Sequence, residues 1–191
     1  PLLVSFMGRS DMRSLTGVEP AGPPRTPGGS RLFSAFYLNE LLVRLLHKHD
    51  PHPGLFLTYG NTLQQLCDHK SVDRALRRFE LNLLQELGFG FDLTLDGSSG
   101  EKIIKDQWYR FDSELGLVYQ RQPREAQPAY IGQDLLAMAQ GDFSGSAQQT
   151  AKRLLRRALA GHLGDKPLKS RDLFRAHSSE LTRAGKPGEA V

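Results

Sequence analysis

The sequence predicts a mainly α-helical fold, in which a helical bundle carries a small β-hairpin insertion and follows a short β segment. Apolar residues recur at helical spacing through three segments before residue 88, which favours helices that pack on one another. Turn residues and two short aromatic segments then replace that spacing between residues 96 and 119, which predicts the hairpin. A chain of 191 residues can bury a core without a disulfide, and its single cysteine forms none internally.

The first 18 residues predict the edge of a β structure, because Leu2, Val4 and Phe6 stand at alternate positions. Chain ends are usually polar, so this apolar start leads us to expect further sequence before Pro1. Residues 19–30 are rich in proline and glycine and predict a linker at a domain boundary.

The bundle is expected to begin directly after this linker. The first helix is predicted from Leu32 to His47, with a broad apolar face, and the second over residues 53–68. The third begins after Ser71, a suitable N-cap, and stops at Gly88. Because short connections join the three, neighbouring helices should run antiparallel.

The hairpin is expected over residues 108–119, and further helices should follow it. A short helix is predicted over residues 132–140. Ser146 and Gln149 have capping-box spacing and predict a long helix that ends near residue 162. Ser170 should cap a last short helix through Arg175, and residues 181–191 are expected to form a disordered tail.

Positive charge gathers near the end of the chain. The segment from Ser146 to Arg175 carries a net charge of +6, whereas the remainder carries −2. On a helix, four of these basic residues share one face and apolar residues take the other, which suits a phosphate backbone. A solvated helix face is the equally simple alternative. The candidate DNA-binding residues are Lys152, Arg153, Arg156, Arg157, Lys166, Lys169 and Arg171.

A second basic feature is the pair Arg77 and Arg78, inside the apolar third helix. Guanidinium groups beside an apolar groove suit an acidic peptide that ends in an apolar residue or a carboxylate. The alternative is that the two arginines pair with Asp73 and Glu80 or extend along the surface.

The sequence gives little support for catalysis, a metal or a cofactor, so no enzyme is expected. Asp92 and Asp96 read as turn formers rather than as an acid–base pair, and Ser98 lacks the strand–helix context of a nucleophile. Histidines 47, 49 and 52 lie at one helix end without a second group of ligands. No apolar run approaches the length of a membrane span, so a soluble, cytoplasmic protein is expected.

Three segments together resemble the RecO family of recombination mediators. They read FYLNELL at residues 36–42, LRRFEL at 76–81 and KPLKSRDLF at 166–174. The similarity extends in the same order over nearly all of residues 1–177. It implies that residues 1–18 are the last part of an N-terminal OB-fold barrel and that residues 31–180 form the helical C-terminal domain.

The resemblance also implies a function in DNA repair and homologous recombination. Family members bind single-stranded DNA and the single-strand binding protein (SSB), anneal strands, help load the recombinase and work with RecR. They bind the acidic, Phe-terminated SSB tail on the helical domain. The matching residues here are Arg77 and Arg78, with Leu76, Phe79 and Leu83 as candidate apolar walls.

Some relatives carry a zinc cluster near residues 92–108, where this chain has no cysteine. Packing by Trp108 and Phe111 is therefore expected to hold this loop instead. The alternative is a protein-interaction module whose basic helix docks an acidic partner.

Overall fold

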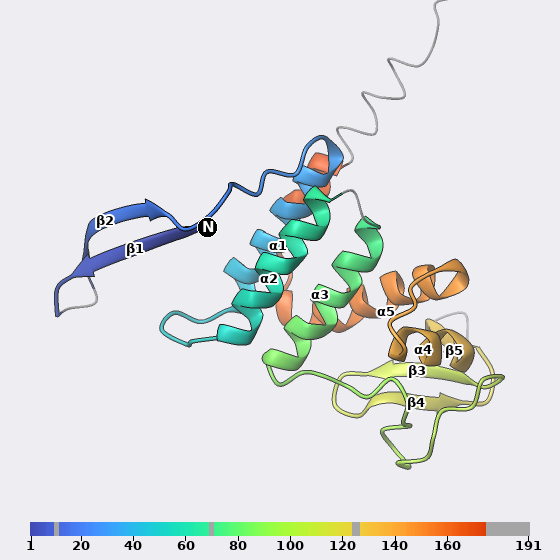
Figure 1. Ribbon diagram of the computed structural model, residues 1–191. Helices are drawn as coiled ribbons and strands as arrows, with labels where there is room; N and C mark the ends of the chain where they lie inside the picture. Colours follow the sequence, from blue (N-terminus) through green and yellow to red (C-terminus); the bar gives the residue numbers. More distant parts are fainter. Residues whose placement is uncertain (10–11, 69–70, 124–126, 175–191) are drawn as a thin grey trace, which may run out of the picture.

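The computed structural model describes residues 1–9, 12–68, 71–123 and 127–174 and is mainly helical, as predicted (Figure 1). The expected tail over residues 181–191 and the expected helix end at Arg175 lie outside these ranges. In the part of the chain that is described, no helix has both the length and the apolar character needed to cross a membrane.

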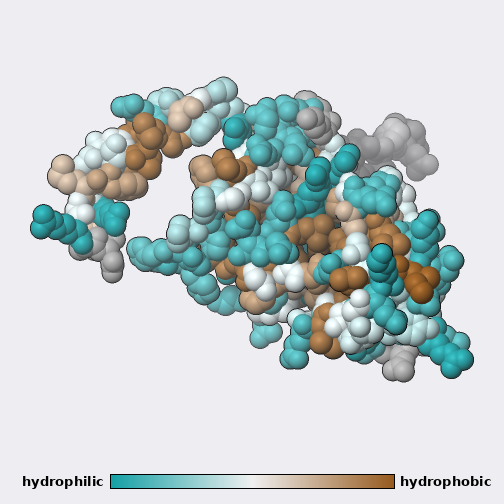
Figure 2. All heavy atoms as spheres, turned by 60° about the horizontal axis from the view of Figure 1, so that its bottom comes forward, coloured by the Kyte–Doolittle hydropathy of each residue, from teal (hydrophilic) through white to brown (hydrophobic). Residues whose placement is uncertain are grey.

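The β segment at the start of the chain forms a two-stranded hairpin. Strand β1 (Leu2–Met7) pairs antiparallel with β2 (Ser14–Pro20), and the register shifts between Ser5 and Phe6. The hairpin extends from the helices as an arm (Figure 1), and hydrophobic surface runs along it (Figure 2). All six side chains of β1 are exposed, and among the described residues β1 pairs with β2 alone.

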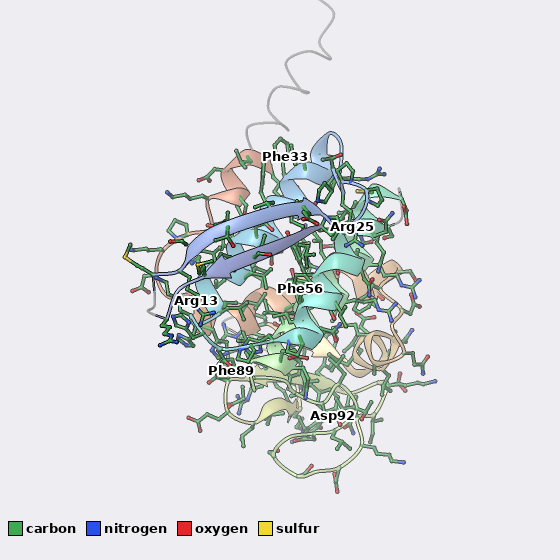
Figure 3. All side chains as sticks on the ribbon, turned by 60° about the vertical axis from the view of Figure 1, so that its left-hand side comes forward. Arg13, Arg25, Phe33, Phe56, Phe89 and Asp92 are labelled. Atoms are coloured by element: carbon green, nitrogen blue, oxygen red, sulfur yellow. The ribbon has the colours of Figure 1, made fainter. Side chains whose placement is uncertain are left out.

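An irregular segment leads from the hairpin to the helices. It lies between Pro20 and the start of the first helix at Ser30, close to the predicted linker. Pro27 is buried in it. Arg25, labelled in Figure 3, donates a hydrogen bond of 3.1 Å from Nη1 to the Gly60 carbonyl oxygen of the second helix.

The three predicted helices are confirmed as α1 (Ser30–Leu45), α2 (Pro53–Cys67) and α3 (Val72–Glu86). Ser71 is the N-cap of α3, because its hydroxyl oxygen accepts a bond from the Arg74 amide. Gly88, just beyond the helix, has φ +79°, a left-handed conformation that glycine adopts without steric cost.

The apolar faces of these helices form the first of two cores. Its fully buried side chains include Leu38 and Leu41 from α1, Leu66 from α2, and Phe79 and Leu83 from α3. Burying large apolar side chains in this way supplies the main free energy that holds the helices together.

The second core lies under a three-stranded sheet in the order β4-β3-β5. The predicted hairpin is confirmed as β3 (Trp108–Asp112) paired with β4 (Gly116–Gln120). Strand β5 (Ala129–Ile131) was not predicted, because three residues carry too little periodicity. Tyr109 is buried and its hydroxyl oxygen accepts a bond of 2.9 Å from the Ile104 amide, so it anchors the preceding loop more deeply than the half-buried Trp108 does.

Two further helices follow β5, α4 (Gly132–Ala139) and α5 (Gly145–Leu163). The predicted capping box at Ser146 is wrong. The N-cap of α5 is Ser144, and the Ser146 hydroxyl donates instead to the Asp134 carboxylate of α4 at 2.6 Å. Helix α5 contributes to both cores: Leu154 belongs to the second and Leu155 to the first.

Candidate functional site

A pocket of about 440 Å³ lies where three helices and the last described turn of the chain come together. Helices α1, α3 and α5 each supply part of its wall, and residues 171 and 174 supply the rest. The pocket therefore joins residues of the two basic features that the sequence singled out separately. Its lining residues are Ser34, Tyr37, Val72, Asp73, Leu76, Arg77, Lys152, Arg156, Arg171 and Phe174.

The neighbouring arginines of α3 occupy different environments. Arg77 is buried and lines the pocket, whereas Arg78 is exposed and is not a lining residue. Leu76 lines the pocket, but Phe79 and Leu83 are fully buried in the helical core and present no surface to a ligand. A helix turns by about 100° per residue, which carries Arg78 away from the wall that Leu76 and Arg77 form.

The apolar walls come instead from Tyr37, Val72 and Phe174. Phe174 contacts Phe33 of α1, labelled in Figure 3, edge to face with ring centroids 5.8 Å apart. No local sequence signal identifies these residues as one site, because the pocket joins positions that are more than 130 residues apart in the chain.

A carboxylate of α1 holds the final helical turn, residues 170–174, against the pocket. Glu40 accepts bonds from the Lys169 amide at 2.8 Å, from the Ser170 amide at 2.9 Å and from the Ser170 hydroxyl at 2.7 Å. The predicted cap is thereby corrected: Glu40 satisfies the first amides of this turn, and Ser170 donates its hydroxyl to Glu40. Partial burial opposes ionisation of Glu40, but these hydrogen bonds outweigh it and lower the pKa of the carboxyl group.

A buried ion pair lies beneath the pocket. Arg77 Nη1 is 2.9 Å from Glu80 Oε2, and the Tyr37 hydroxyl donates to Glu80 Oε1 at 2.7 Å. Glu80 has no exposed surface. The buried carboxylate of Glu80 therefore contacts two of the side chains that line the pocket, Tyr37 and Arg77.

The predicted basic face of α5 is exposed and divides between two surfaces. Lys152 and Arg156 line the pocket. Arg153 lies outside it, with its guanidinium carbon 5.7 Å from the centroid of the Tyr130 ring. Arg157 is exposed one turn further along α5. The opposite face of α5 is buried, as predicted, through Ala151, Leu154, Leu155, Ala158 and Leu159.

The remaining predicted basic residues differ in position. Lys166 and Lys169 are exposed in the segment between α5 and the last turn, and Arg171 lines the pocket. Arg44 of α1 holds this segment by donating to the carbonyl oxygens of Leu163 and Pro167. The segment is thus fixed at both ends, by Arg44 and by Glu40.

Comparison with known proteins decides the family. The family model for the C-terminal part of recombination protein O matches residues 28–172. The chain belongs to the RecO family. A protein from Stutzerimonas stutzeri named DNA repair protein RecO is 44% identical over 176 residues, which cover 91% of this chain and 72% of the relative. Proteins of the same name from Methylococcus capsulatus and Nitrosococcus oceani are 42% and 43% identical over 93% and 97% of this chain, and 73% and 74% of those relatives.

The pocket of this RecO-family chain is strongly cationic. Four basic side chains line it, from Arg77, Lys152, Arg156 and Arg171, against the single carboxylate of Asp73. Asp73 is itself engaged, because Gln148 Nε2 donates to its Oδ2 at 2.8 Å. Cationic groups between aromatic and aliphatic walls suit a ligand with an anionic end and an apolar side chain.

The acidic residues of the loop before β3 stabilise turns, as the sequence predicted. Asp92 Oδ1 accepts a bond from the Thr94 amide at 2.7 Å, and Asp96 Oδ1 accepts one from the Ser98 amide at 2.8 Å. The Ser98 hydroxyl also donates to Asp96, at 2.6 Å. Within the described ranges, no group of three or more histidine, cysteine or carboxylate side chains is arranged to hold a metal ion.

Proposed function

We propose that this RecO-family chain acts in DNA repair as a recombination mediator that binds both single-stranded DNA and the acidic tail of SSB. The observation that carries the proposal is the pocket between α1, α3 and α5, where four cations meet apolar walls. The names of the relatives support the repair role. In this proposal the chain promotes strand annealing and recombinase loading by binding, without a catalytic step.

The pocket suits a Phe-terminated acidic peptide. Tyr37, Val72 and Phe174 offer an apolar surface for the terminal ring, and Arg77 and Arg171 offer charge-assisted donors to the carboxylate at the chain end. The volume of about 440 Å³ lies within the range of sites that hold a small ligand or a few residues.

The exposed cations of α5 suit the backbone of single-stranded DNA. Arg153 and Arg157 continue the positive face beyond the pocket, and Lys166 and Lys169 follow on the next segment. Binding of this kind depends on counterion release, so it should be steeply salt-dependent and little dependent on sequence.

The β1–β2 hairpin has the exposed apolar side chains expected of strands that belong to a larger β structure. The side chains of β1 are exposed, and alternate apolar residues line both faces. We propose that these strands belong to an OB-fold barrel, as the family resemblance implies, and that contact with RecR depends on that barrel.

Fluorescence anisotropy of a labelled SSB-tail peptide tests the peptide site. The full chain should bind the peptide saturably, and removal of the terminal phenylalanine should weaken binding about tenfold or more, since one buried aromatic ring is worth about 1.5–3 kcal/mol. Equal binding of the two peptides would contradict the assignment of the apolar walls.

Arg156 and Arg157 provide a matched pair for this test. Both are exposed cations on α5, but only Arg156 lines the pocket. Arg156→Ala should weaken binding of the tail peptide, whereas Arg157→Ala should leave it nearly unchanged. Equal losses would indicate general attraction of an acidic peptide to a basic helix, which is the alternative interpretation.

The DNA site is tested with a labelled bare single strand at several salt concentrations. Replacing Arg153, Arg156 and Arg157 together by alanine should weaken binding similarly for all sequences. The slope of log affinity against log salt should fall by about 2, since each phosphate contact on a single strand contributes about 0.7. An unchanged slope would exclude these residues from the DNA interface.

A further inference from the structure

The buried carboxylate of Glu80 is an unusual feature of the pocket. Glu80 lies on α3 with none of its surface exposed, although a charged group loses much of its hydration when buried. Its two oxygens face Tyr37 of α1 and Arg77 of α3, at 2.7 Å and 2.9 Å. An apolar residue would fill the same place at no desolvation cost, so stability alone does not account for this pair.

The charges around Glu80 belong to the pocket. Burial raises the pKa of Glu80 above its ordinary value, and Arg77, the Tyr37 hydroxyl, Arg156 and Arg171 offset only part of that rise. Arg77, Arg156 and Arg171 all line the pocket. Glu80 is therefore an internal counter-ion to Arg77, which it contacts, and it lies within electrostatic range of Arg156 and Arg171.

The same carboxylate fixes the orientation of two lining groups. Burial raises the pKa of Tyr37 well above its usual value, with a smaller contribution from Glu80, so the phenol keeps its proton and donates a hydrogen bond to Glu80. Arg77 Nη1 forms an ion pair with Glu80 Oε2, while the buried Nε–H of Arg77 and Oε2 of Glu80 have no hydrogen-bond partner among the described residues. A buried donor without a partner is costly, and an incoming carboxylate could accept its hydrogen bond.

We propose that Glu80 is a positioning residue that makes the pocket select a peptide carboxylate over a chain of phosphates. It fixes the fork of Arg77 and the hydroxyl of Tyr37, and it offsets part of the positive charge. Recognition of a single carboxylate depends on donor geometry, whereas attraction of a nucleic-acid backbone depends on the amount of positive charge. The proposal rests on the proposed function of the pocket.

The test is Glu80→Gln, which keeps the shape of the side chain and removes its charge. Affinity for the acidic tail peptide should fall about tenfold, because the fork of Arg77 loses its charge-assisted contact. Affinity for a bare single strand at the same salt concentration should stay the same or rise, because the pocket gains one net positive charge. A purely structural role would weaken both ligands together, and that outcome would overturn the proposal.

Two further variants keep the test decisive. Tyr37→Phe removes only the hydroxyl that donates to Glu80 and should shift the ratio of the two affinities in the same direction, by less. If Glu80→Gln does not fold, the comparison is made with Tyr37→Phe. Glu114→Gln makes the same charge change at an exposed residue outside the pocket and should leave the ratio unchanged.

The outcomes separate this inference from the proposed function. If the unaltered chain does not bind the tail peptide, the function of the pocket is wrong. If it binds, but the ratio of peptide to strand affinity is the same in Glu80→Gln and Tyr37→Phe as in the unaltered chain, only the role of Glu80 is wrong.

Discussion

At the scale of single residues, the difference between Arg77 and Arg78 matters most. The sequence places both in an apolar helix and cannot say which one is buried, since the apolar face of α3 extends around a wide arc. The structure buries Arg77 against Glu80 and leaves Arg78 in solvent. The alternative interpretation, in which the arginines pair with Asp73 and Glu80, therefore holds for Arg77 with Glu80, although Arg77 also lines the pocket.

Arg77 and Arg78 should contribute differently to the free energy of unfolding. Arg77→Ala leaves the buried carboxylate of Glu80 without its cation and should lower the free energy of unfolding by about 3 kcal/mol. Arg78→Ala removes an exposed side chain and should change it by less than about 0.5 kcal/mol. Urea unfolding followed by circular dichroism measures both, and similar losses would contradict the burial of Arg77.

The carboxylate of Glu40 should make the stability of the last helical turn depend on pH. Its folded pKa is lowered, so the stabilisation it provides is complete above its unfolded pKa of about 4.3 and is lost as pH falls through the folded value. The NMR shift of the Ser170 amide should therefore titrate with a midpoint below about 4.3. In Glu40→Gln that titration should disappear; a midpoint above the ordinary glutamate value would show that the hydrogen bonds do not form in solution.

At the scale of elements, α5 was predictable as an amphipathic helix, but its role in the pocket was not. Spacing alone assigns Leu154 and Leu155 to one face and Arg156 and Arg157 to the other, and burial confirms this. Which basic residues meet Arg77 depends on how α5 crosses α3, and that crossing is set by contacts distant in sequence. The capping box predicted for the start of α5 was wrong for a similar reason, because the Ser146 hydroxyl donates to Asp134 of another helix.

Because Lys152 and Arg156 belong both to the pocket and to the basic face, the two proposed ligands should compete. Saturating tail peptide should reduce the salt slope of single-strand binding by about 1.4, equivalent to the loss of two phosphate contacts. Anisotropy of a labelled strand with unlabelled peptide measures this. Arg156→Ala should weaken the competition, and a slope unaffected by peptide would mean that the strand does not pass over the pocket.

At the scale of the whole molecule, the described helices and the sheet share α5 as a common wall. Leu155 completes the helical core, and Leu154 completes the core beneath the sheet. Phe91 and Phe111, with ring centroids 5.0 Å apart, pack against both cores. The two cores are therefore expected to unfold together.

A substitution on one side of α5 should test this cooperativity. Leu154→Ala should lower the free energy of unfolding by about 3 kcal/mol, since it opens a cavity at a fully buried leucine. The fluorescence of Trp108, the only tryptophan and a residue of the sheet, and the helical circular dichroism should shift together. Separate transitions would mean that the cores are independent.

The position of α5 also determines where the chain can be divided. Domain boundaries usually fall in loops that few contacts cross, and such loops are where proteins tolerate cleavage and exchange of parts. Here the border between the two cores runs lengthwise along a helix. A cut anywhere from residue 88 to residue 144 would separate α1–α3 from Leu155, Ala158 and Leu159. The two halves could therefore be exchanged between relatives only if α5 moved with both of them.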